Sequence, residues 1–183
     1  MQKNHKKQVR RLASVVFINV AGSSKLALQD ELEGITLWVR YLNLAKKIAK
    51  KHDGNIATNI GDSMLLAFSS AAAAVEFASN LLSELKDFNA MYRPKTPIRL
   101  KIGITAGEVV AMNSDLLGTP VNLAMTLASL ARANEILCSE AVWQLVADEL
   151  PLKFQEKKQV VEGLGKVSNY SLTKQVREKY AFV

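Results

Sequence analysis

The chain has little of several residue types that mark particular protein classes. Cysteine occurs once, at Cys138, so no internal disulfide can form. The two histidines, His5 and His52, are far apart and are accompanied by too few cysteine or acidic residues to suggest a zinc site. No run approaches the ~18 apolar residues of a membrane span, and the N-terminus is basic rather than apolar. We therefore expect a cytoplasmic protein without a transmembrane segment or a secretory signal.

The residues that are present predict one globular domain. The 183 residues are 49% apolar, enough for a proper core, and the net charge is +7. We expect a basic arm over residues 1–11, a domain over 12–174 and a tail over 175–183. The arm could contact an anionic membrane, nucleic acid or an acidic partner, although such tails are more often solvated termini. Its basic residues are Lys3, Lys6, Lys7, Arg10 and Arg11.

Periodicity gives the order of the elements. Apolar residues at steps of three and four predict a helix that ends near residues 52–54, and a second, alanine-rich helix follows over 71–88. Strands are expected at 15–20, on both sides of the turn at 59–62, and near 98–105 and 107–112. This order predicts an α+β, ferredoxin-like βαββαβ sandwich with additional C-terminal elements. The expected buried faces are Leu28, Leu32, Ile35, Val39, Leu42, Ala45 and Ala49 in the first helix, and Ala71, Ala74, Ala78, Leu81, Leu85 and Phe88 in the second.

Three short stretches contain the candidate functional residues. VVFINVAGSS (15–24) is an apolar strand with one polar residue, Asn19, in its middle. NIATNIGDSMLLAF (55–68) indicates two strands joined by a tight turn, which places Asp62 level with Asn19 if the strands are neighbours. DLLGTPVNLAMTL (115–127) starts at a turn and becomes a helix after Gly118, with Asn122 and Thr126 on one face.

Together these stretches resemble the catalytic domain of class III nucleotidyl cyclases, the adenylate and guanylate cyclase family. They correspond to its F-x-D-I-x-G strand, its K-x-x-G-D hairpin and its D-x-x-G-x-x-V-N-x-A-x-R helix entry. Further matches follow in order at 102–110, 134–142 and 161–172, so the resemblance covers roughly residues 12–174. Several collinear motifs are far more specific than a single short pattern.

The resemblance implies a role for each site position. The family holds two metal ions, Mg or Mn, on two aspartates, and these positions are Asn19 and Asp62 here. The base-selecting lysine falls at Thr58, and the acidic residue that reads the base matches Asp115. The ribose-positioning asparagine matches Asn122, and the transition-state arginine falls at Thr126. One carboxylate and two cations are therefore replaced, and Asp62 is the one metal-type carboxylate that remains.

These replacements predict a loss of catalysis. A transition-state arginine in phosphoryl transfer is worth about 10³–10⁵ in rate, and one preorganised donor about 10²–10³. The family forms its sites between two subunits, so a homodimer would repeat the same defects twice. A heterodimer with an intact cyclase-type domain would still lack one carboxylate in one site and two cations in the other.

Simpler explanations exist for the residues that remain. An aspartate such as Asp62 is also typical of any tight hairpin. Asp115 lies in a turn-rich stretch, where an aspartate that hydrogen-bonds its own backbone is common. Asn122 could hold local backbone groups at a helix start. The loop Gly22-Ser23-Ser24 leads into a long helix, where free backbone N–H groups favour the phosphates of a nucleoside triphosphate. The alternative for this loop is a hydrated helix start.

Three hypotheses follow from the sequence. The first is a catalytically inactive cyclase-like domain that dimerises and senses a nucleotide in intracellular signalling. The second is an active, divergent cyclase that converts a nucleoside triphosphate to a cyclic nucleotide and pyrophosphate. The third is a nucleic-acid-binding α/β sandwich, which the positive charge would suit, but no K/R-G-F/Y run marks a base-stacking strand.

Overall fold

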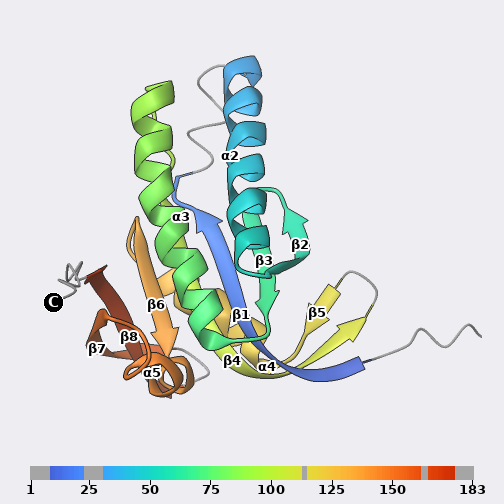
Figure 1. The fold of residues 1–183 in the computed structure, drawn as a ribbon, viewed down its shortest axis with the longest axis vertical. Coiled ribbons are helices and arrows are strands. Elements are labelled where there is room, and N and C mark those ends of the chain that lie inside the picture. Colours follow the sequence, from blue (N-terminus) through green and yellow to red (C-terminus); the bar gives the residue numbers. More distant parts are fainter. Residues whose placement is uncertain (1–8, 23–30, 113–114, 162–164, 176–183) are drawn as a thin grey trace, which may run out of the picture.

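The computed structural model describes residues 9–22, 31–112, 115–161 and 165–175, which form one mixed sheet with helices on both faces (Figure 1). The strands run in the order β2-β3-β1-β4-β6-β8-β7, with the short β5 paired to β4. The elements are β1 (Val9–Val20), α2 (Glu31–Lys51), β2 (Asn55–Ile60), β3 (Ser63–Phe68), α3 (Ala71–Tyr92), β4 (Leu100–Met112), β5 (Asp115–Leu117), α4 (Thr119–Leu130), β6 (Glu135–Ser139), α5 (Glu140–Val146), β7 (Leu152–Val161) and β8 (Gly165–Gln175).

The first six of these elements form the expected ferredoxin-like unit. In chain order they are strand, helix, strand, strand, helix, strand, and in the sheet β1 lies between β3 and β4, antiparallel to both. The strand β6 then adds parallel to β4, and the hairpin of β7 and β8 extends the sheet beyond it. The α+β fold class predicted from the sequence is confirmed.

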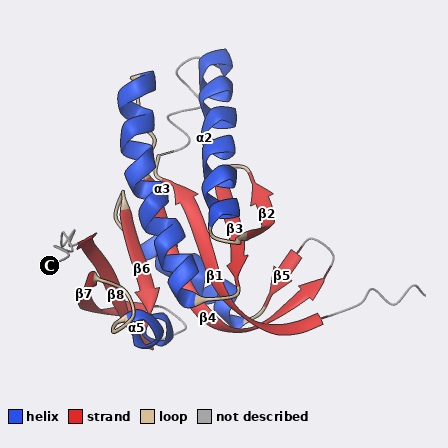
Figure 2. Ribbon diagram, viewed as in Figure 1, coloured by secondary structure: helices blue, strands red, loops and turns tan. Residues whose placement is uncertain are grey.

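Alternation along β1 divides the core between the two faces of the sheet. Val16, Ile18 and Val20 pack with α2 and α3, whereas Ala13 and Val15 pack with α4. Figure 2 shows α2 and α3 side by side on one face, with α4 behind the strands. Because successive side chains of a strand point to opposite faces, Asn19 belongs to the α4 face.

The buried face of α2 differs from the expected one. Ala45 and Ala49 are buried and Leu42 is half-buried, but Ile35 and Val39 are 54% and 49% exposed. The residues that fill the core are Leu37, Tyr41, Ala45, Ile48 and Ala49. The stripe is therefore rotated relative to the prediction, because Leu37 and Tyr41 supply a second apolar row that competes for the sheet. Leu28 and the side chain of Leu32 lie outside the described residues.

Other predicted elements need smaller corrections. The strands expected at 98–105 and 107–112 are one continuous strand, β4, because Gly107 pairs in register with Ala13 instead of breaking the ladder. The hairpin turn is shorter than expected, since Asn59 and Ile60 still belong to β2. The strand β1 begins at Val9, so it includes residues assigned above to the basic arm.

The buried face of α3 is as predicted. All six residues expected on the inner face of α3 are buried. Cys138 is fully buried in β6, and burial raises the pKa of its thiol to about 12. None of the helices in the described part of the chain has a stretch both long and apolar enough to cross a bilayer.

Candidate functional site

Asn19 and Asp62 lie side by side where β1 meets the β2–β3 turn. Asn19 is the register partner of Ser63, the residue after Asp62. The backbone N–H of Val20 donates to the carbonyl oxygen of Asp62 at 3.3 Å, which fixes the turn against the strand. The carboxylate of Asp62 accepts a hydrogen bond from Ser63 Oγ at 3.3 Å. This half-buried corner therefore contains one carboxylate, one amide and one hydroxyl.

Lys101 is a site residue that the sequence did not reveal. It is the partner of Asn19 on β4, on the side of β1 away from Ser63. Side chains of directly opposed residues in antiparallel strands lie on the same face, so Lys101 and Asn19 share the α4 face. The Lys101 ammonium donates to the carbonyl oxygen of Ser129 near the end of α4, at 2.6 Å. Only the strand register places Lys101 opposite Asn19, and no local pattern indicates this pairing.

The two predicted base-contacting positions contact one another. Thr58 Oγ1 on β2 donates to Asp115 Oδ1 on β5 at 3.3 Å. The Asp115 carboxylate is exposed, and Thr58 is half-buried. The Asp115 carboxylate therefore accepts a hydrogen bond from a neutral hydroxyl. A lysine at position 58 would instead form an ion pair with this carboxylate. No fixed positive charge is present at position 58.

The two predicted positions on α4 are one helical turn apart. Thr126 Oγ1 donates back to the carbonyl oxygen of Asn122 at 3.0 Å, so its hydroxyl is used within the helix. Asn122 is exposed. The helix start is fixed by Thr105 Oγ1, which donates to the carbonyl oxygen of Pro120 at 2.7 Å. The α4 helix thus presents a neutral amide and a short neutral side chain where the family pattern has an amide and a guanidinium.

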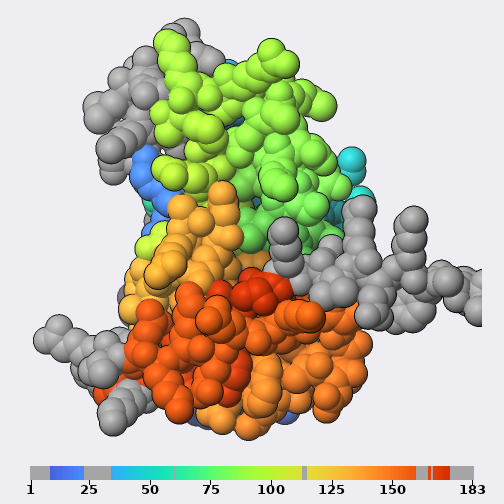
Figure 3. Space-filling model, turned by 90° about the vertical axis from the view of Figure 1, so that its left-hand side faces the viewer, coloured from blue at the N-terminus to red at the C-terminus, as the bar shows by residue number. Residues whose placement is uncertain are grey.

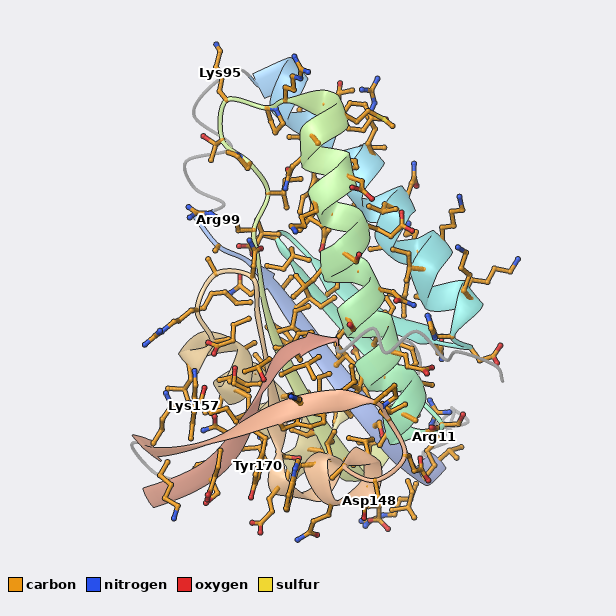
Figure 4. All side chains as sticks on the ribbon, turned by 60° about the vertical axis from the view of Figure 1, so that its left-hand side comes forward. Arg11, Lys95, Arg99, Asp148, Lys157 and Tyr170 are labelled. Atoms are coloured by element: carbon orange, nitrogen blue, oxygen red, sulfur yellow. The ribbon has the colours of Figure 1, made fainter. Side chains whose placement is uncertain are left out.

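The loop after β1 is described only at its start. Gly22 has a φ of +74°, and an added Cβ there would meet no atom within 4 Å. The backbone N–H of Ala21 donates to the carbonyl oxygen of Arg99 at 2.8 Å. In Figure 4, Arg99 marks this end of β1 and Arg11 marks the other end. Ser23 and Ser24, both expected to contribute to phosphate binding, lie outside the described residues.

The donor set at this corner does not fit a pair of divalent ions. Mg²⁺ needs carboxylate or phosphate oxygens, and Asn19 gives a neutral amide beside the single carboxylate of Asp62. Lys101 adds positive charge on the same face as Asn19. Elsewhere in the described part of the chain, no three His, Cys, Asp or Glu side chains are grouped so as to hold an ion. Asp62 is thus the one carboxylate available for an ion that arrives with a triphosphate.

Comparison with known proteins supports the reading of these motifs. Residues 5–174 match the family profile described as "Adenylate and Guanylate cyclase catalytic domain". The chain is 31% identical over 135 residues to an adenylate cyclase of Streptomyces griseus, covering 73% of this chain and 32% of that protein. It is 30% identical over 133 residues to an adenylate cyclase of Streptomyces coelicolor, covering 72% and 33%.

The structural match covers nearly the whole of the other chain, whereas the sequence matches cover only part of the relatives. The crystal structure of the adenylyl cyclase CyaB from P. aeruginosa superposes with a TM-score of 0.85 and 26% identity, covering 93% of this chain and 98% of that chain. In contrast, the chain spans only about a third of the length of these two Streptomyces proteins.

Proposed function

Because this chain belongs to the adenylate and guanylate cyclase catalytic domain family, we propose that it is a catalytically silent member that dimerises and binds a nucleotide as a regulatory signal. The observation that supports this proposal most directly is the loss of charge at three of the family's site positions. Asn19 stands where a metal carboxylate is expected, and Thr58 and Thr126 stand where two cations are expected.

The hydrogen bonds of the two threonines strengthen this argument. Thr58 donates to Asp115, and Thr126 donates to the carbonyl oxygen of Asn122. Both hydroxyls already have acceptors within the chain, so neither has to turn toward a substrate to be satisfied. Stabilisation of a transition state requires preorganised charge aimed at the reacting group, and a neutral hydroxyl bonded elsewhere supplies little of it.

Formation of a dimer would not restore the missing charge. In the family, one subunit contributes the metal residues and the other contributes the base, ribose and phosphate contacts. A homodimer of this chain would place Asn19 and Asp62 of one subunit opposite Thr58 and Thr126 of the other, in both sites. We therefore assign the dimer a structural or regulatory role. We place it in the cytoplasm, where nucleoside triphosphates are found.

A second candidate function is that of a divergent cyclase, which three retained residues favour. Asp62 keeps one metal-type carboxylate, Asp115 keeps the acidic base-contacting position, and Asn122 keeps the ribose-positioning amide. Such an enzyme would operate with one well-held ion and without the usual cations, so it would be slow.

Two measurements on the purified protein distinguish these functions. Incubation with each nucleoside triphosphate and Mn²⁺ should yield no cyclic product at a rate above that of a heat-denatured sample. Calorimetric titration with ATP and GTP, with and without Mg²⁺ or Mn²⁺, should show binding of at least one nucleotide. Turnover at an ordinary cyclase rate would overturn the silent assignment, and absence of both turnover and binding would reduce the domain to a dimerising scaffold.

A further inference from the structure

The outward face of α2 joins two surface features that the proposed function does not use. Its N-terminal half leaves Ile35 and Val39 about half exposed, at 54% and 49%. Its C-terminal half exposes four lysines within six residues, at positions 46, 47, 50 and 51. Glu31 and Glu33 are the acidic residues of this helix, and from residue 34 to residue 51 every charged residue is basic.

Within the described residues, no acidic side chain forms an ion pair with any of these four lysines. Each ion pair among the described residues lies elsewhere: Arg10–Glu108, His52–Glu76, Lys157–Glu135 and Lys158–Glu156. Like charges four residues apart repel on a helix, and 46/50 and 47/51 are such pairs. Lysines in a last turn also complement the helix dipole, which accounts for Lys50 and Lys51 but not for the two a turn earlier.

The exposed aliphatic residues are unexpected on a solvated helix. The sequence pattern places Ile35 and Val39 on a buried stripe, yet the core takes Leu37 and Tyr41 instead. Trp38 and Leu42, which flank them on the same side of the helix, are only partly buried against the core. A basic segment next to exposed aliphatic side chains is typical of helices that lie in a membrane interface.

We propose that the outer face of α2 docks on an anionic lipid surface, with Ile35 and Val39 entering the headgroup region and the four lysines contacting lipid phosphates. Charge complementarity selects an anionic surface, and the two aliphatic side chains favour lipid over nucleic acid, from which they would gain nothing. The helix covers the sheet face opposite to Asn19 and α4, so docking would leave the site face open (Figure 1).

On α3, acidic residues accompany the exposed apolar side chains of Met91 and Tyr92. The exposed residues of α3 include Glu76, Glu84 and Asp87, which would be repelled by anionic lipid. Figure 3 shows the face built from α3, α5 and the C-terminal hairpin, from which little of α2 is seen. Binding through α2 would therefore turn this mixed-charge face away from the membrane.

The test is co-sedimentation of the full chain with vesicles. Vesicles of phosphatidylcholine with about one third phosphatidylserine should bind the protein, and pure phosphatidylcholine vesicles should not. Each lysine near an anionic surface contributes about fivefold in affinity, so replacing all four α2 lysines by Gln should weaken binding by at least about a hundredfold.

The double variant Ile35→Ser, Val39→Ser should weaken binding to the anionic vesicles by about tenfold. Raising the salt from 0.1 to 0.5 M should release the protein, because the Debye length shortens.

A matched control separates α2 from net charge and from the basic N-terminal residues, which all variants retain. Replacing the exposed residues Lys86, Arg132, Lys153 and Lys158 by Gln removes the same charge from other surfaces and should change binding by less than about threefold. Thermal melts of both quadruple variants report whether they are folded. Equal loss of binding in the two variants, or no binding to anionic vesicles, would overturn the proposal. So would duplex DNA binding of equal strength that the two serine substitutions leave unchanged.

Discussion

Thr58 and Asp115 are 57 residues apart in the chain, yet the hydroxyl of one donates to the carboxylate of the other at 3.3 Å. The contact joins the edge strand β2 to the short strand β5 across the front of the predicted base-binding position. Because it keeps Asp115 on a neutral partner, it fixes the carboxylate without offering a cation to a substrate. Under the proposed silent function, catalysis would need charge to be restored here and at two other positions.

Restoring all three charges should produce cyclase activity. The triple variant Asn19→Asp, Thr58→Lys, Thr126→Arg would supply the second metal carboxylate and both cations. We expect its rate with Mn²⁺ and ATP to exceed that of the parent by at least about 10³, because a transition-state arginine alone is worth about 10³–10⁵. Production of cyclic nucleotide, separated chromatographically, measures the gain.

Each charge should be of little use without the others. Groups that act as a unit are strongly non-additive, so the three single variants should remain near the background rate. Adding Asp62→Asn to the triple variant should abolish the activity gained, since that change removes the remaining metal-type carboxylate. An inactive triple variant that is folded and dimeric would show that the defect is not electrostatic.

Gly103 should be intolerant of even a methyl group. A Cβ at this position of β4 would lie 2.1 Å from the carbonyl oxygen of Ala124 and 2.6 Å from the backbone nitrogen of Ala128. The helix α4 would have to move away from the sheet, so Gly103→Ala should lower the free energy of unfolding by about 3 kcal/mol or more, as overpacked cores do.

Urea denaturation monitored by circular dichroism measures this change. Glu108→Ala on the same strand serves as the control, because it removes only the exposed ion pair with Arg10 and should cost less than about 1 kcal/mol. Equal stability of Gly103→Ala and the parent would mean that α4 can move away from this strand at little cost.

The sequence predicted the elements of the site better than their contacts. Asn19, Asp62, Asn122 and Thr126 lie on the elements expected for them, because strand alternation, the Gly61 turn and the Gly118 helix entry are local features. Asp115 was expected in a turn but begins the short strand β5, which pairs with β4. The functional roles of these residues stay predictions. The motifs did not predict the hydrogen-bond partner of each side chain. Thr126, for example, donates to the carbonyl oxygen of Asn122 in its own helix.

The features that sequence reasoning missed depend on long-range packing. Lys101 comes to Asn19 only through the register of two strands that are far apart in the chain. The exposure of Ile35 and Val39 follows from competition between two apolar rows on α2, and periodicity alone does not decide which row meets the sheet. Both cases turn on tertiary contacts that a local pattern does not contain.

Tyr41 should be replaceable by Phe with a gain in stability. Its side chain is fully buried in the main core, and its hydroxyl has no hydrogen-bond partner there. Burial raises the pKa of Tyr41 far above its usual range, so the phenol stays neutral and keeps its O–H. Removing an unpaired buried polar group should raise the free energy of unfolding by about 1 kcal/mol.

Thermal and urea denaturation of Tyr41→Phe, compared with Tyr92→Phe, test this expectation. Tyr92 is 38% exposed, so loss of its hydroxyl should change stability by less than about 0.5 kcal/mol. A destabilised Tyr41→Phe variant would mean that the Tyr41 hydroxyl finds a partner in solution.

Glu135 should make stability depend on pH at the acidic end. Its carboxylate, at the start of β6, accepts hydrogen bonds from the backbone N–H of Arg132 at 2.7 Å, from Ser171 Oγ at 2.7 Å and from the Lys157 ammonium. Burial alone would raise the pKa of Glu135, but these three donors outweigh burial and lower it. The folded protein therefore binds the Glu135 proton more weakly than the unfolded chain does.

The sign of the effect follows from linkage. A depressed pKa contributes stability that is fully present above the unfolded value of about 4.3, and this stability is lost as the pH falls through the folded value. Glu135→Gln should cost about 1–3 kcal/mol at pH 7, since hydrogen bonds to a charged group are lost. The difference in the free energy of unfolding between the parent and this variant should shrink steadily below about pH 4.3.

Urea denaturation from pH 3 to 7 measures this difference. The exposed Glu156→Gln serves as a control, and its difference from the parent should change little with pH. A difference that grew as the pH fell would mean that the carboxylate is protonated in the native state.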